Sequence, residues 1–350
     1  MLSIDGTLFA GAGLALVRYI SWNRAQKFGP KITVIGDVEC HIIADRIEEI
    51  PDWGDQVYVP NPPSVKAGGS CLNTAIWLRN LSHSFCVTVP QTYSRVGVWT
   101  EVINQSAQKA FLNVVPSSEN ESMETGTSLC LAGSNERSFI KYSGANAIFK
   151  LSDFETDLLV PEKTRHIHFG GYFNCPGIWG DEIISFIKTC RQKSVKTISL
   201  NPQFTQDWDR GIYSILPLID FFICNKHEAI TITDLSDVTD AIQELSKLCN
   251  CIVVTLGEDG ALLMRKCVDL RPLRILCKES TEISFEDTIG VGDAFCAGFI
   301  SEIVSKNLGA ESPQLVDAVR FACACGTAAC TVTGGSTFPG TQTIRECLID

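Results

Sequence analysis

From residue 165 onward, short apolar runs rich in β-branched residues alternate with longer amphipathic segments. Short runs bounded by turn residues predict buried strands, and apolar residues at helical spacing predict helices between them. This order predicts an α/β fold, in which a largely parallel sheet lies between layers of helices. Ligands of such sheets bind beyond the carboxyl ends of the strands, so the residues after each predicted strand are the first candidates for a functional site.

The predicted elements of this part of the chain follow one another closely. The predicted strands are 166–171, 197–203, 219–225 and 251–264 (a strand, a turn and a strand), and the predicted helices are 179–193, 226–234, 237–249, 293–306 and 312–332.

The first half of the chain gives less regular signals. KITVIGDVE at 31–39 predicts a buried first strand, and a Gly-Gly pair leads into a helix predicted over 70–82. The stretch 45–65 alternates and carries prolines, which predicts short exposed strands and turns. The stretch 126–142 predicts a hairpin that turns through GSNER.

Composition excludes several classes of protein. The 350 residues, 45% of them hydrophobic, suffice for one large domain or two smaller ones. The net charge is −11 and no basic stripe is visible, so we expect no nucleic-acid partner. No apolar run reaches about 18 residues, so no membrane-spanning segment is expected.

The 16 cysteines are scattered through apolar segments of a long chain, which favours reduced core residues over a disulfide scaffold. Two groups have C-x-C spacing, Cys249/Cys251 and Cys323/Cys325/Cys330, whereas zinc sites use C-x₂-C, so core packing is favoured over a metal. For His166 and His168, on one strand face, we favour a partly buried pair over a ligand pair.

Residues 1–30 form a separate N-terminal extension, and residues 31–350 form the main domain. The extension is apolar and rich in small residues but lacks the basic start of a secretory signal. An organelle-targeting leader and a helical extension both fit it. With the cysteine pattern, this predicts an intracellular protein, either cytoplasmic or organellar.

The segment DTIGVGDAFCAGF (287–299) joins an extended run, a Gly-x-Gly turn and the start of a helix. Glycines permit close backbone approach, and successive N–H groups at a helix start form an anion cavity. Asp293 then has two interpretations. It is the cap of the helix, or it is a carboxylate that takes a proton from a hydroxyl attacking a phosphate. No Gly-Lys-Ser/Thr follows, so this is not a P-loop.

Two further motifs follow the same logic. Gly68-Gly69 opens a helix with Asn73 one turn in, which suits a hydroxylated ligand or an ordinary loop-to-helix turn. Asn225 and Glu228, at i and i+3 after a strand, suit either a Mg²⁺ that carries phosphates or a capping box.

A third motif lies in the stretch VVTLGEDGALL. Thr255 and Gly257 end a strand, and the chain turns through Gly260 into the next. A nucleotide lying over this backbone and a plain hairpin turn fit it equally well.

In this order, and with Ser-Gly-Ala-Asn at 143–146 and Leu-Asn-Pro at 200–202, these motifs resemble the ribokinase-like (PfkB) family of carbohydrate and nucleoside kinases. The resemblance covers roughly residues 31–345 and is most specific in DTIGVGDAFCAGF. It implies a three-layer sandwich with a central, mainly parallel sheet and a small β-strand lid formed near 40–67 and 126–142. It also implies ATP-dependent phosphorylation of a hydroxymethyl group on a sugar or sugar-like acceptor.

The resemblance implies a role for each motif residue. Asp293 would be the catalytic base, and Gly290, Val291 and Gly292 would line an anion hole with their backbone amides. The acceptor would contact Asp37, Glu39, His41, Gly68, Gly69 and Asn73. ATP would be bordered by Asn225, Thr255, Gly257, Gly260 and Cys323, and Mg²⁺ would be held through water by Asn225 and Glu228. A monovalent cation such as K⁺, used by many members, would lie at Asp287, Ile289 and Ser336.

Departures from the family pattern concern the acceptor. His41 stands where members often carry an acidic residue, Ser70 follows the two glycines, and no Gly-Asp-Asp-x-Gly follows the first helix. A nucleoside kinase of the same fold and a catalytically inactive, regulatory relative are the alternatives. Because exposed strands pair readily, the lid is also a candidate surface for a homodimer.

Overall fold

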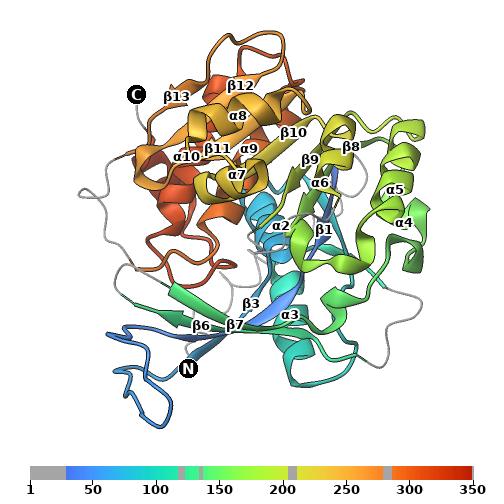
Figure 1. Ribbon diagram of the computed structural model, residues 1–350. Coiled ribbons are helices and arrows are strands. Elements are labelled where there is room, and N and C mark those ends of the chain that lie inside the picture. The colour runs from blue at the N-terminus through green and yellow to red at the C-terminus, as the bar shows by residue number, and fades with distance from the viewer. Residues whose placement is uncertain (1–28, 117–122, 134–136, 204–210, 279–285, 349–350) are drawn as a thin grey trace, which may run out of the picture.

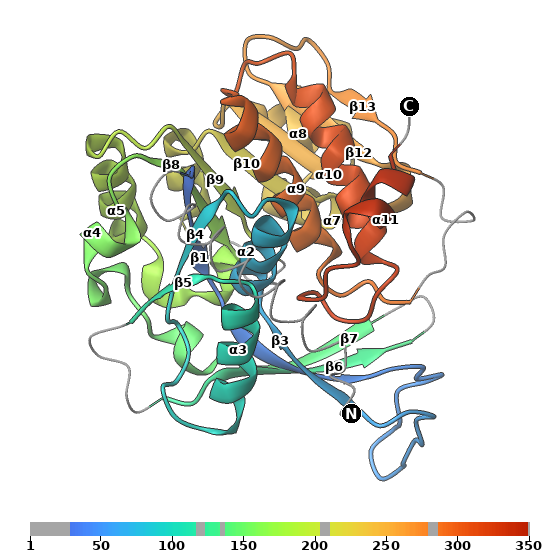
Figure 2. The same ribbon diagram turned by 180° about the vertical axis from the view of Figure 1, so that it is seen from behind.

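The computed structural model describes residues 29–116, 123–133, 137–203, 211–278 and 286–348. Within these ranges the chain forms a nine-stranded sheet and a separate four-stranded sheet, with helices on both faces of the larger one (Figures 1 and 2). The predicted N-terminal extension, residues 1–30, lies outside the described residues except for its last two.

The nine-stranded sheet is mainly parallel, as predicted. Its strands, in spatial order, are β13 (Leu273–Ile275), β12 (Ala261–Arg265), β11 (Cys251–Thr255), β10 (Phe221–Asn225), β9 (Thr197–Asn201), β8 (Thr164–Gly170), β1 (Lys31–Gly36), β4 (Cys86–Pro90) and β5 (Asn113–Val115). Neighbouring strands run parallel from β5 to β11, and β12 and β13 add antiparallel at one edge.

Helices cover both faces of this sheet because its strands are apolar on both sides. The α-helices are α2 (Ser70–Leu81), α3 (Val98–Lys109), α4 (Thr156–Leu159), α5 (Asp181–Gln192), α6 (Ile212–Ile215), α7 (Lys226–Thr233), α8 (Val238–Ser246), α9 (Val291–Lys306), α10 (Leu315–Ala329) and α11 (Thr341–Glu346). One buried core joins the sheet to α2, α9 and α10, and a second joins it to α5, α7 and α8. This is the predicted three-layer sandwich. No helix in the described ranges combines the length and apolar character that a membrane span requires.

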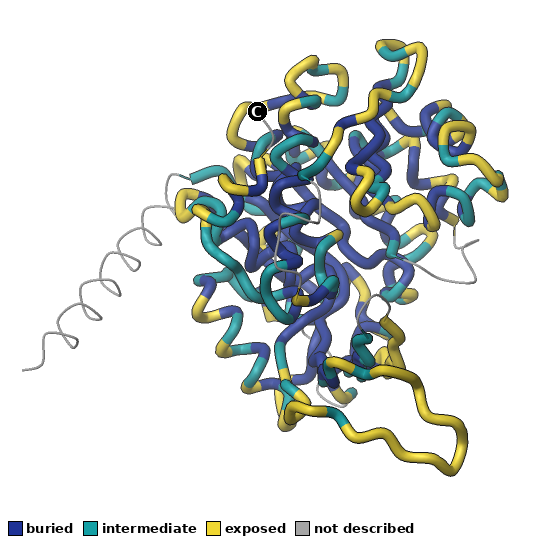
Figure 3. Tube along the Cα trace, turned by 90° about the vertical axis from the view of Figure 1, so that its left-hand side faces the viewer, coloured by how far each residue is buried: buried dark blue, intermediate teal, exposed yellow. Residues whose placement is uncertain are grey.

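The four-stranded sheet has the order β3 (Ser64–Gly68), β2 (Glu39–Ala44), β6 (Gly126–Ala132) and β7 (Arg137–Tyr142). The predicted hairpin is present, since β6 and β7 pair antiparallel. Between β2 and β3 the prediction of short strands is wrong, because residues 45–63 form no strand and project as an exposed loop (Figure 3). Four prolines in this loop, Pro51, Pro60, Pro62 and Pro63, remove backbone donors that a ladder needs.

The predicted single strand 31–39 is also wrong in one respect. β1 ends at Gly36, and β2 begins at Glu39 in the other sheet. Gly36 has φ 152°, and a Cβ there would lie 1.7 Å from the carbonyl oxygen of Gly170 on β8. The chain therefore leaves the large sheet at a position that only glycine fits. This crossing places Asp37 at the carboxyl ends of the parallel strands.

His166 and His168 differ from the expected partly buried pair. Both are fully buried between β8 and β9, and they hydrogen-bond to Thr197 and Ser199 at 2.7–2.8 Å. Burial lowers the pKa of both imidazoles, so they are neutral polar members of the core. Fourteen of the 16 cysteines are buried, and none forms a disulfide.

Candidate functional site

Asp293 lies at the start of α9, against the start of α2. Its side chain is buried and accepts hydrogen bonds from Ser70 Oγ at 2.7 Å and Asn73 Nδ2 at 2.8 Å. Gln203 Nε2 lies 3.4 Å from the same carboxylate. Burial raises the pKa of Asp293, and the two α2 side chains oppose that shift. The carboxylate is thus held in a fixed orientation and has a higher proton affinity than an exposed aspartate.

The turn before Asp293 is closed by glycines. Gly290, with φ 78°, is the cap of α9, and Asp293 is the third residue of the helix. The interpretation of Asp293 as the helix cap is therefore wrong. A Cβ on Gly290 would lie 2.3 Å from Cα of Gly335, so these two loops pack backbone to backbone. The first amides of a helix, here those of Val291 and Gly292, have no intrahelical partner and can bind an anion.

Asp37 holds the start of α2 from the end of β1. Its Oδ1 accepts from the Ser70 amide at 2.8 Å, and its Oδ2 accepts from Asn174 Nδ2 at 2.8 Å. Burial, with the nearby charge of Glu39, raises the pKa of Asp37 to about 7. Asp37 therefore supplies, from a distant strand, the acceptor that a helix N-terminus usually takes from its own cap.

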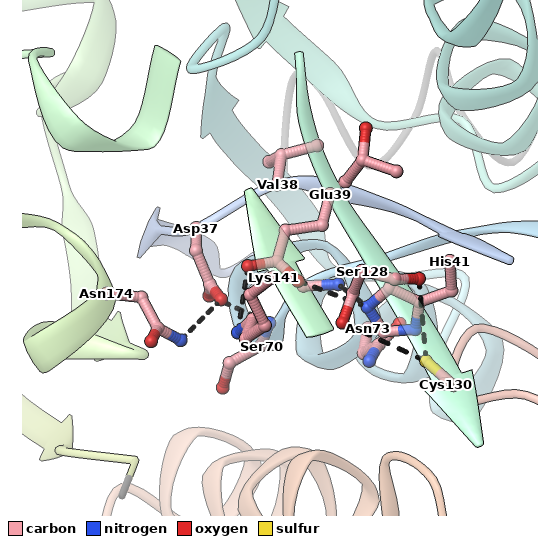
Figure 4. Close-up of polar contacts among 12 residues, drawn as sticks. Asp37, Val38, Glu39, His41, Ser70, Asn73, Ser128, Cys130, Lys141 and Asn174 are labelled. Carbon is pink, nitrogen blue, oxygen red and sulfur yellow. Dashed lines mark hydrogen bonds and ion pairs between the residues drawn. The ribbon is translucent and has the colours of Figure 1, made fainter. Parts of the chain in front are cut away.

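A charged cluster lies next to it on the small sheet (Figure 4). Glu39 forms an ion pair with Lys141 at 2.9 Å, and its Oε2 lies 3.4 Å from Nε2 of His41. The same His41 nitrogen lies 3.3 Å from the amide of Gly69. Burial opposes ionisation of Glu39, but the contacts with His41 and Lys141 outweigh it and lower its pKa. Glu39 is thus a charged group at neutral pH.

Gly68 and Gly69 are required for this arrangement. A Cβ on Gly68 would lie 2.4 Å from the His41 ring. Gly69 has φ 89°, and a Cβ there would lie 2.4 Å from the backbone oxygen of Asp37. The glycine pair therefore lets β2, β3 and α2 meet at one point.

Two buried polar atoms in this cluster have no hydrogen-bond partner among the described residues, Asn73 Oδ1 and His41 Nδ1. An unpaired buried polar atom costs about 1–3 kcal/mol. Such atoms suit a hydroxylated ligand, because a hydroxyl group both donates and accepts.

Asn225 and Glu228 form a capping box at the start of α7. Asn225 Oδ1 accepts from the Glu228 amide at 2.8 Å, and Glu228 Oε2 accepts from the Asn225 amide at 2.9 Å. Of the two interpretations of this pair, the capping box is therefore the one that the structure shows. Burial raises the pKa of Glu228 to about 7. An amide oxygen and a carboxylate are still donors that suit Mg²⁺, so a water-mediated role is compatible with the cap.

Two of the predicted ATP-binding residues, Thr255 and Gly257, lie at the end of the strand next to this pair and just after it. Asn225 and Thr255 are register partners at the ends of β10 and β11. Gly257, with φ 66°, borders open space, whereas a Cβ on Gly260 would lie 2.1 Å from the Ile275 oxygen. Gly260 therefore serves the turn, and Cys323 is a buried residue of α10.

The three residues expected beside a monovalent cation are near one another but engaged. Asp287 accepts hydrogen bonds from the amides of Ile289 at 2.9 Å and Gly334 at 2.7 Å. Ser336 Oγ donates to the Ala67 oxygen at 2.7 Å.

Lys141, Asn174, Asn146 and Gln203 belong to the site but were not predicted from the sequence. Asn146 bonds to both backbone groups of Val38 at 3.0 Å and so fixes the link between the two sheets. The Ser-Gly-Ala-Asn motif contained this signal. Lys141 had only its alternation within the hairpin as a signal. Asn174 ends a short 3-10 helix and Gln203 follows β9, and neither has a local signal of its own.

Comparison with known proteins agrees with this fold. The sequence model of the pfkB family carbohydrate kinases matches residues 30–342, and this chain belongs to that family. Adenosine kinase 2 of Arabidopsis thaliana is 27% identical over 223 residues, which are 59% of this chain and 63% of that protein. The probable chloroplastic fructokinase-6 of the same plant is 25% identical over 232 residues, 63% of this chain and 58% of that protein. The aligned region thus spans less than two thirds of each relative.

Solved structures show the same fold. Ribokinase from Giardia lamblia matches with a TM-score of 0.74 at 17% identity, covering 91% of this chain and 99% of that one. Arabidopsis thaliana ribokinase, solved with ribose and ATP, matches with a TM-score of 0.71 at 18% identity, covering 91% and 98%.

Proposed function

We propose that this chain is an ATP-dependent kinase that phosphorylates a hydroxymethyl group of a sugar or sugar-like acceptor. The observation that carries the proposal is the buried Asp293 carboxylate, fixed by Ser70 and Asn73 directly after the Gly290 turn. A base and an anion cavity thus lie within one helical turn, as transfer of a phosphoryl group to a hydroxyl requires.

In this proposal Asp293 takes the proton from the acceptor hydroxyl as it attacks the γ-phosphate of ATP. The amides of Val291 and Gly292 then stabilise the charge that spreads over the transferring group. Mg²⁺, when bound with ATP, would neutralise phosphate charge, and Asn225 and Glu228 would orient its water ligands. Thr255 and Gly257 would border the nucleotide. Closure of the small sheet as a lid would exclude water and so limit ATP hydrolysis.

The inner face of the small sheet supports a sugar rather than a nucleoside. His41, Ser128 and Lys141 are cross-strand partners and form a polar row on β2, β6 and β7. Lys66 continues the row on β3, but its ammonium is bonded to Thr333 and Thr337. The row nearest the glycine turn is Gly68, Glu39 and Gly126. Among the described strand residues of this face, Phe139 is the one with an aromatic ring of Phe, Tyr or Trp type, and it lies one row further from the glycine turn. Charged and hydroxyl groups suit several hydroxyls better than the flat apolar face of a base.

The test is ADP release from ATP with a panel of pentoses, hexoses and nucleosides. We expect at least one sugar to raise turnover about tenfold or more above the rate without acceptor, because a hydroxyl held at Asp293 competes with water. Preference for a nucleoside would contradict the sugar assignment. Nucleotide binding by calorimetry without turnover on any acceptor would instead support the regulatory alternative.

The outer face of the small sheet is a candidate dimer surface. Val65, Ile42, Leu129 and Ile140 are direct cross-strand partners, and they form an apolar row in which Val65 is 43% and Ile140 64% exposed. Large exposed apolar patches mark interaction sites. We propose that a second copy of this chain covers this row.

Ile140→Lys should therefore convert a dimer to a monomer, because a charge would be buried without a partner. The mass measured by light scattering after gel filtration would halve. Leu270→Lys is the matched control, since Leu270 is 96% exposed outside this sheet. A wild-type protein that is monomeric at micromolar concentration would contradict the proposal.

A further inference from the structure

Lys66 reaches from the small sheet to a loop of the main body. It lies on β3, and its Nζ donates to the backbone oxygen of Thr333 at 2.7 Å and to Thr337 Oγ1 at 3.2 Å. Its stem passes over Gly334, where a Cβ would lie 2.6 Å from Lys66 Cδ. A side chain at position 334 would block this path, so Gly334 lets the Lys66 ammonium reach the loop.

The loop of residues 333–337 packs against the turn at Gly290–Gly292, which is called the anion turn below. Gly335 packs on Gly290, where an added Cβ would lie 2.3 Å from the Gly335 Cα. The Gly335 oxygen accepts from Trp77 Nε1 at 3.0 Å, which ties the loop to α2. The position of the Gly290 turn therefore depends on this loop.

The family resemblance places a monovalent cation here, but the side chains expected to bind it already have protein partners. Both carboxylate oxygens of Asp287 accept backbone amides, and the Ser336 hydroxyl donates to Ala67. The positive charge on the loop already comes from Lys66. An ammonium group offers three donors and a point charge, so it can bind carbonyl oxygens in place of a cation.

We propose that Lys66 is a positioning residue that replaces the monovalent cation beside the anion hole. It holds the 333–337 loop against the Gly290 turn, and the kinase therefore works without K⁺. Because Lys66 belongs to β3, the small sheet and the anion turn are ordered together. This inference rests on the proposed kinase activity, but one of its tests does not.

The first test measures ADP release in potassium, sodium and tetramethylammonium chloride at equal ionic strength. Wild-type turnover should agree within about twofold in all three, because screening is the same. Lys66→Met should lower kcat about 10- to 100-fold in tetramethylammonium, since a charge-assisted hydrogen bond is lost, and potassium should restore part of it. Lys66→Arg should stay near wild type. Lys188→Met, at an exposed position of α5, is the matched control.

The second test needs no acceptor. Thermal unfolding is followed in the same three salts. The midpoint of Lys66→Met should rise by about 2–5 °C in potassium relative to tetramethylammonium, whereas wild type should not change. A potassium-dependent midpoint or turnover in wild type would overturn the proposal, as would a folded Lys66→Met protein with normal kcat. If Lys66→Met does not fold, the wild-type salt series and Lys66→Arg still decide the question. If no acceptor is turned over, the proposed function fails while the thermal test still stands.

Discussion

Asp293→Asn is expected to lower kcat by roughly 10³-fold, with little change in the KM for ATP. An amide cannot take the proton from the attacking hydroxyl, and general-base catalysis is typically worth about 10²–10⁴-fold. Asn has nearly the same shape, so the contacts with Ser70 and Asn73 can be kept by rotation of the amide. Steady-state ADP release with the acceptor found in the panel measures the effect.

Asp240→Asn is the matched control for this variant. Asp240 is the third residue of α8, as Asp293 is of α9, but it is exposed. Near-normal kcat in Asp293→Asn, with unfolding unchanged, would show that Asp293 is not the base.

The pH profile of wild type gives an independent check. Burial raises the pKa of Asp293, and in the proposed mechanism the active form is the carboxylate. The value of kcat/KM should therefore fall as the pH decreases through that raised pKa, above the value of about 3.9 for an exposed aspartate. A profile that stays flat down to about pH 4 would contradict a buried base.

Gly36→Ala is expected to have the largest effect on stability, a loss of about 4 kcal/mol or more in the free energy of unfolding. The new Cβ would lie 1.7 Å from the Gly170 oxygen, a backbone atom of the paired strand β8. Relief of that contact requires the backbones of β1 and β8 to separate at their carboxyl ends, where the chain crosses to the small sheet. Urea unfolding followed by circular dichroism measures the loss, and insoluble expression is its extreme form.

Gly180→Ala separates the clash from backbone strain. Gly180 also has positive φ, 67°, but nothing lies within 4 Å of an added Cβ. This control should cost only about 1–2 kcal/mol. If the free energy of unfolding of Gly36→Ala lies within about 1 kcal/mol of the wild-type value, the close packing of β1 on β8 is not essential.

The sequence alone was sufficient for the order of elements and for the glycine turn. Hydrophobic periodicity is local, so strands such as 197–203 and helices such as 179–193 could be predicted within a few residues. The turn at Gly290 that opens a helix was also correct, because glycine and a following apolar helix leave a local signal. The extended segment expected directly before it is no strand over its described residues 286–289. The break of strand 31–39 was missed, since the pattern does not tell which sheet a residue joins.

The contacts that complete the candidate site depend on tertiary structure. Asn73 and Ser70 meet Asp293 across more than 200 residues of chain, and Glu39 meets Lys141 across the hairpin. Such pairs are set by strand order and register, which bring distant segments together and leave no local pattern. The sequence therefore determined which residues stand at strand ends. Only the packing of α2 against α9 on one face of the sheet decided which of them face one another. Only the register of β3 directed Lys66 to the loop behind the anion turn.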